Sequence, residues 1–139
     1  MPDPMPSPHA DLDALSKVEL HALADGLLQP ETWLIELCVE FVLAETKGLW
    51  HGRARAMMCR RLKHCVLGRT HRSQLVTAIT GRLTSGSFSE QFKDQLRLAM
   101  HLDLKQTLEA CRKGLSSHKL HVKRYSAWAL SPEHVQNAP

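Results

Sequence analysis

The residues of this chain that most clearly suggest a chemical role are basic side chains spread along several apolar segments. Arranged on one face, such cations would attract phosphate groups or an acidic protein surface. The same residues also suit an ordinary solvated helix face, and the sequence leaves both interpretations open. Phosphate contacts alone carry no base-sequence specificity. The residues of this candidate surface are Arg53, Arg55, Arg60, Arg61, Lys63, Lys93, Arg97, Lys123 and Arg124.

Thiols are the next candidates, because they bind metals and act as nucleophiles. Zinc requires about four converging ligands, usually supplied as two close pairs. The cysteines form no CxxC pair, and the six-residue spacing of Cys59 and Cys65 places them on different faces of a helix. We therefore expect reduced, buried thiols, no metal site and no cofactor. The four cysteines are Cys38, Cys59, Cys65 and Cys111.

The short motifs of common catalytic sites are missing from the chain. It contains no GxSxG, HExxH, P-loop or GxGxxG sequence. Glu36 and Glu40 have the spacing of one helix face, which is typical of an acidic surface exposed to solvent. The cysteines lie in apolar patterns, where thiols are unreactive. The sequence therefore predicts a protein that is not an enzyme.

Length and composition indicate one globular domain. The chain has 139 residues, of which 43% are hydrophobic and 23% charged. A core of this size needs no disulfide or metal to be stable. No apolar run approaches the ~20 residues of a membrane span, and the proline-rich start does not resemble a signal peptide. We expect a flexible leader at 1–10, a domain at 11–131, a polar tail at 132–139, no membrane contact and a cytoplasmic location.

Charge is distributed unevenly along the chain. Residues 1–50 contain two basic and nine acidic residues, whereas residues 51–139 contain sixteen basic and five acidic residues. This asymmetry indicates either a charged partner or contacts between the two oppositely charged parts of the chain.

Apolar residues recur at helical spacing and predict an all-α fold of seven helices. The first helix covers about 17–25, the third about 51–65, and the second extends towards Gly48. The last begins near Lys119 and ends before Pro132. Capping residues mark the starts of five helices: Ser16 with Glu19, Pro30, Thr70, Ser87 with Glu90, and Asp103 with Gln106.

A unit of two apolar helices joined by a turn recurs along the chain. Residues 76–83 match 108–115 at a shift of 32, and residues 92–100 match 122–130 at a shift of 30. A weaker copy covers residues 34–62. Units of this kind bury their apolar faces by stacking, and about three are the usual minimum. The expected core includes Ile79, Leu83, Leu96, Ala99, Leu108, Cys111, Val122 and Ala129.

This pattern resembles the HEAT-like family of helical repeats, over residues 31–131. Those repeats often have a Val-Arg or Val-Lys step followed by small and apolar residues, which the last copy matches at Val122-Lys123-Arg124, Ala127, Ala129 and Leu130. The earlier copies depart from it, with Phe92-Lys93-Asp94 and Arg53-Ala54-Arg55. The resemblance implies a short right-handed α-solenoid of about three HEAT-like helix pairs, with the first helix as an N-terminal cap.

The resemblance also implies a function, because solenoids commonly present extended binding surfaces. We expect a non-catalytic scaffold or adaptor that binds a protein or peptide partner. Nucleic-acid binding through the basic residues, weak and non-specific, is the alternative. HEAT-like DNA glycosylases combine a basic concave surface with aromatic residues and a carboxylate, but the 5% aromatic content and short chain disfavour such an enzyme. Its candidate residues are Trp50, Trp128, Tyr125 and Asp94.

Overall fold

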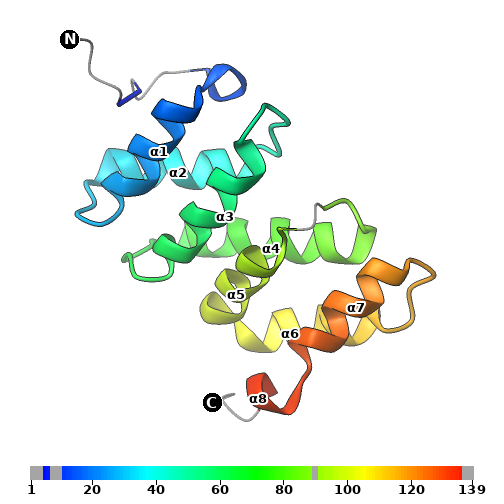
Figure 1. The fold of residues 1–139 in the computed structure, drawn as a ribbon. Helices are drawn as coiled ribbons and strands as arrows, with labels where there is room; N and C mark the ends of the chain where they lie inside the picture. Colours follow the sequence, from blue (N-terminus) through cyan, green and yellow to red (C-terminus); the bar gives the residue numbers. More distant parts are fainter. Residues whose placement is uncertain (1–4, 7–10, 89–90, 136–139) are drawn as a thin grey trace.

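The computed structural model describes residues 5–6, 11–88 and 91–135. Within these ranges the secondary structure is entirely helical, which confirms the all-α prediction (Figure 1). A 3-10 turn, Leu12–Ala14, precedes the first helix, and the short helix α8, Pro132–Val135, follows the last long one. The seven long helices are α1 Lys17–Gly26, α2 Thr32–Leu43, α3 His51–Leu62, α4 Arg69–Ser85, α5 Lys93–Leu102, α6 Leu104–Gly114 and α7 Leu120–Ala129.

Side-chain caps begin two of these helices as predicted. At α1, the Ser16 hydroxyl accepts from the Glu19 amide at 3.2 Å, and the Glu19 carboxylate accepts from the Ser16 amide at 3.0 Å. At α6, the Asp103 carboxylate accepts from the Gln106 amide at 3.0 Å. Each cap satisfies backbone donors that the first helical turn leaves unpaired.

Two other predicted caps have different outcomes. The N-cap of α4 is Gly68, so Thr70 lies inside the helix and the prediction for it is wrong. Helix α5 begins only at Lys93, without a side-chain cap. Of the pair predicted to open it, Glu90 lies outside the described residues.

The long helices form two layers. Helices α1, α3 and α5 lie side by side in one layer, and α2, α4 and α6 lie side by side in the other (Figure 1). Helix α7 packs against α6 and α4. One continuous core fills the space between the helices, and all eight predicted core residues are buried in it. The stacking of apolar helix faces therefore produces this core.

Some features depart from the expected repeat. Leu115, which matches the buried Leu83 in the repeat, is 45% exposed. The segment expected to be a polar tail includes α8, where His134 packs on Trp128 with 4.8 Å between ring centroids. Most of the leader 1–10, and residues 136–139 of the tail, lie outside the described residues.

Two ion pairs join the acidic and basic parts of the chain. Arg61 contacts Asp25 at 2.8 Å, and Arg82 contacts Glu45 at 2.7 Å. Contacts between the oppositely charged parts were one of the two explanations for the charge asymmetry. Separately, the described helices include none with both the length and the apolar composition to cross a bilayer.

Candidate functional site

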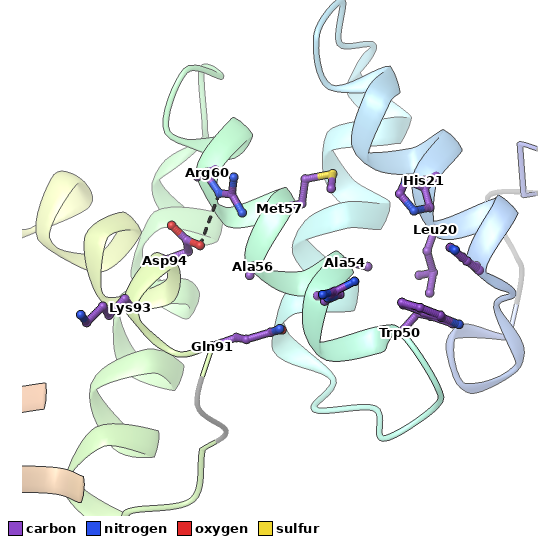
Figure 2. A pocket seen from close by; sticks show the side chains of 12 residues that line it. Leu20, His21, Trp50, Ala54, Ala56, Met57, Arg60, Gln91, Lys93 and Asp94 are labelled. Carbon is purple, nitrogen blue, oxygen red and sulfur yellow. Dashed lines mark ion pairs between the residues drawn. The ribbon is translucent and has the colours of Figure 1, made fainter.

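A groove of about 510 Å³ runs across the layer of α1, α3 and α5 (Figure 2). We call it the α1–α3–α5 groove. Figure 2 shows Leu20 and His21 at one end, and Lys93 and Asp94 at the other, with α3 between them. The residues that line it are Lys17, Leu20, His21, Trp50, Arg53, Ala54, Ala56, Met57, Arg60, Gln91, Lys93 and Asp94.

The sequence of α3 places both small and large side chains along this groove. Residues at positions i, i+3 and i+4 of a helix share a face. Arg53, Met57 and Arg60 follow that spacing, and all three line the groove. Ala54 and Ala56 also line the groove, and both are buried and have short side chains.

Trp50 forms an apolar surface beside the groove, between two cations. Its side chain is 38% exposed, and its backbone has a left-handed φ of 71° just before α3. The Lys17 ammonium lies 4.2 Å from the ring centroid, and the Arg53 guanidinium lies 5.5 Å away. Cations held over an indole ring are attracted by its negative face. These contacts combine an exposed aromatic ring with two positive charges.

Asp94 holds two arginines at the other end of the groove. Its carboxylate is 15% exposed and contacts Arg60 Nε and Arg97 Nη1, each at 3.3 Å. Lys93 and Arg97 also lie over the ring of Trp128, at 5.2 Å and 5.1 Å from its centroid. The positive charge at this end is therefore partly neutralised.

The structure brings together only part of the predicted basic surface. Arg53, Arg60 and Lys93 line the groove, and Arg97 joins them through Asp94. Arg61 is half-buried and paired with Asp25, and Lys63 is also half-buried.

The remaining three predicted residues lie elsewhere. Lys123 and Arg124 are exposed on α7 and do not line the groove. The prediction for Arg55 as a surface residue is wrong, because its side chain is only 8% exposed. Its Nη2 donates to the Thr46 carbonyl oxygen at 2.7 Å and to the Thr46 hydroxyl at 2.9 Å.

Several groove residues were not predicted. Lys17, His21, Met57 and Gln91 line it, but none has a distinctive spacing in the sequence. Lys17 belongs to the acidic part of the chain, and only the packing of α1 on α3 places it beside Trp50. Of the residues considered for a glycosylase, Trp50 and Asp94 line the groove, whereas Tyr125 and Trp128 lie on α7.

The four cysteine thiols lie in surroundings that make them unreactive. Burial raises the pKa of Cys38 and of Cys59 to about 12, and that of Cys111 to about 11. Burial also raises the pKa of the half-buried Cys65. All four are therefore protonated near neutral pH, and a protonated thiol is a poor nucleophile. In the described ranges, no three His, Cys, Asp or Glu side chains gather as a metal site would require.

Comparisons of the chain with protein-family models, curated proteins and solved structures gave no match.

Proposed function

We propose that this protein is a non-catalytic helical-repeat adaptor that binds an acidic segment of a protein partner in the α1–α3–α5 groove. The observation that carries the proposal is the exposed ring of Trp50 between Lys17 and Arg53. We expect an apolar partner side chain to contact the exposed part of this ring, and acidic partner side chains to pair with Lys17 and Arg53. Tryptophan and arginine are also the residues that most often dominate protein interfaces.

The arrangement of the helices supports the repeat part of the proposal. The helices that follow one another as α2 and α3, α4 and α5, and α6 and α7 are in contact, as in a stack of hairpins. Helix α1 packs against α3 at one end of the stack, where an N-terminal cap would lie. We infer a short α-solenoid of about three HEAT-like pairs, which presents its groove on the layer of α1, α3 and α5.

The ion pairs favour a protein over a nucleic acid as the partner. A nucleic-acid backbone presents regularly spaced phosphates and is bound by unpaired cations. Asp94 occupies Arg60 and Arg97, and Asp25 occupies Arg61, so three of the predicted cations already have carboxylate partners. A short peptide with one apolar and a few acidic residues needs only the Trp50 ring and its neighbours Lys17 and Arg53, which form no ion pair among the described residues.

Selection from a random peptide library displayed on phage tests this proposal. We expect the wild-type chain to enrich sequences with acidic residues around an aromatic or large aliphatic residue. Trp50→Ala should lower the affinity for the selected peptides by tenfold or more. Arg53→Gln should lower the affinity for the peptides with the most acidic residues. Leu120→Ala is the matched control, because Leu120 is a 69% exposed apolar residue outside the groove. Enrichment of basic peptides, or equal binding by Trp50→Ala and Leu120→Ala, would contradict the proposal.

A further inference from the structure

A second pocket, of about 470 Å³, lies between the α2–α3 loop and helices α4 and α5. Thr46 and Lys47 line it from the loop, Arg55 from α3, Arg82 from α4, and Gln95 from α5. It shares no lining residue with the α1–α3–α5 groove. We call it the Arg55 pocket.

All three guanidinium nitrogens of Arg82 have partners. Its Nη2 donates to the carbonyl oxygens of Val42 and Leu43 at 2.8 Å and 2.9 Å. Its Nη1 donates to the Gln95 side chain at 2.8 Å, and its Nε pairs with the Glu45 carboxylate at 2.7 Å. This guanidinium therefore caps the end of α2 and has both charge and hydrogen-bond partners.

Arg55, in contrast, has few partners for its charge and its N–H groups. It is more than nine-tenths buried, and its hydrogen bonds with the described residues are the two from Nη2 to Thr46. Its Nε is buried without a hydrogen-bond partner, and the described residues provide no carboxylate in ion-pair contact with it. The ring of Phe41, 5.2 Å away, is its apolar neighbour. A buried charge without a counter-ion destabilises a folded protein.

The charges around the pocket do not balance. Three cations, Lys47, Arg55 and Arg82, line it together with one carboxylate, that of Glu45. Glu45 adopts a left-handed backbone with a φ of 41°, which is unfavourable for a residue other than glycine, and its side chain pairs with Arg82. Burial, followed by repulsion from Arg82, lowers the pKa of Arg55. Both effects show that the charge on Arg55 is poorly compensated.

We propose that the Arg55 pocket binds a phosphate dianion, either inorganic phosphate or a phosphate monoester, between Arg55 and Lys47. Two negative charges match the excess of two positive charges among the four charged lining residues. Thr46 engages only the Nη2 of Arg55, which leaves the N–H groups of Nη1 to donate charge-assisted hydrogen bonds to phosphate oxygens. The exposed Ser87 hydroxyl lines the same pocket and adds a donor.

NMR titration of the full chain with sodium phosphate tests the proposal, with sodium chloride at matched ionic strength as the reference. We expect saturable shifts of the Arg55 Nε–H signal and of the backbone amides of residues 46–48. A second titration uses N-acetyl-phosphoserine amide. Equal shifts with both probes show that the site accepts the phosphate group of a monoester as well as the free anion. Shifts with inorganic phosphate alone assign the site to the free anion.

Variants separate binding at this pocket from general salt effects. Lys47→Gln should weaken phosphate binding about tenfold, whereas Lys113→Gln, an exposed lysine on α6, should leave it unchanged. Arg55→Lys should abolish the saturable shifts because it removes the Nη1 donors. Lys47→Gln keeps the test valid if Arg55→Lys does not fold. Shifts that grow linearly with phosphate and equal those in chloride would overturn the proposal. Unchanged binding by Lys47→Gln would do the same.

Discussion

His51 and Thr46 form a buried polar contact that connects three parts of the chain. His51 is 1% exposed, and its Nε2 lies 3.0 Å from the Leu15 carbonyl oxygen. A carbonyl oxygen only accepts, so we assign the imidazole proton to Nε2. The other ring nitrogen, Nδ1, then accepts from the Thr46 hydroxyl at 2.6 Å, and that hydroxyl oxygen accepts from Arg55. Each hydrogen bond from Leu15 to Arg55 thus has a defined donor and acceptor.

Replacing Thr46→Val removes the hydroxyl while keeping the shape of the side chain. Because His51 Nδ1 and one Arg55 bond lose their partner in a buried site, we expect a loss of about 1–3 kcal/mol in the free energy of unfolding. Urea denaturation measures this loss. Thr77→Val is the control, since Thr77 is exposed on α4 and should change stability by less than about 0.5 kcal/mol. Equal stability of the two variants would contradict the assignment of Thr46 as the hydrogen-bond partner of His51 and Arg55.

The buried thiols predict how stability depends on alkaline pH. Folding raises the pKa of Cys38 and Cys59 from 9.0 to about 12, so the unfolded chain loses these protons first. Their contribution to stability is therefore complete below pH 9 and declines as the pH rises towards 12. The decline approaches about 1.4 kcal/mol per pH unit for each thiol. Urea midpoints between pH 8 and pH 11 should show a shallower decline in Cys59→Ala than in the wild type. Parallel declines would contradict the prediction.

At the scale of single helices, the sequence predicted those helix starts that are capped by a side chain close by in the sequence. Ser16 and Asp103 cap their helices as their spacing indicates. The end of α2 was predicted too late, towards Gly48, whereas the helix ends at Leu43. Arg82 binds the carbonyl oxygens of Val42 and Leu43 from a position about 40 residues away in the sequence. No local pattern reports such a contact, so tertiary packing determines that boundary.

The contact of α6 with α7 depends on the absence of a side chain at Gly114. A Cβ atom there would overlap the Ser126 hydroxyl and lie 3.3 Å from Val122 Cγ1. Alanine generally favours a helix over glycine by about 1 kcal/mol, but overpacking a buried contact costs about 1–3 kcal/mol. We expect the overlap to dominate, so Gly114→Ala should lower the thermal midpoint.

A second variant identifies the cause of that loss. The Ser126 hydroxyl is buried without a hydrogen-bond partner, so Ser126→Ala alone should be neutral or slightly stabilising. Combined with Gly114→Ala, it should restore much of the lost stability, because it removes the overlapping oxygen. Calorimetry of the two single variants and the double variant measures this coupling. Strictly additive changes would show that the two residues do not act through one contact.

At the scale of the whole molecule, the sequence predicted the all-α class and the core better than the candidate site. Arg53, Arg60 and Lys93 line one groove because α3 and α5 are neighbours in one layer. The roles of Lys17 and Trp50 depend on how α1 packs on α3, which the spacing of residues does not encode. Arg55 was misassigned because an arginine on a basic helix is usually exposed, whereas this one turns towards Thr46.

The net positive charge of the molecule predicts weak binding of DNA. Charge alone gives affinities of about 10⁻⁴–10⁻⁶ M at physiological salt, without preference for sequence. We expect fluorescence anisotropy to show equal affinity for two unrelated duplexes and a steep loss with added salt. Lys123→Glu with Arg124→Glu should weaken binding without disturbing Asp25 or Asp94, because both residues are exposed on α7. Tight binding of one duplex only would favour a specific nucleic-acid protein over the adaptor.

The two-layer arrangement also affects the folding rate of the chain. Among the described residues, every extensive helix–helix contact joins helices with at most two others between them along the chain. Such neighbours meet after closing only short loops, and proteins rich in local contacts fold in microseconds to milliseconds. Stopped-flow refolding should therefore be complete within milliseconds. The two ends of the molecule need never meet, so α1 and α7 can each form on helices that are already in place.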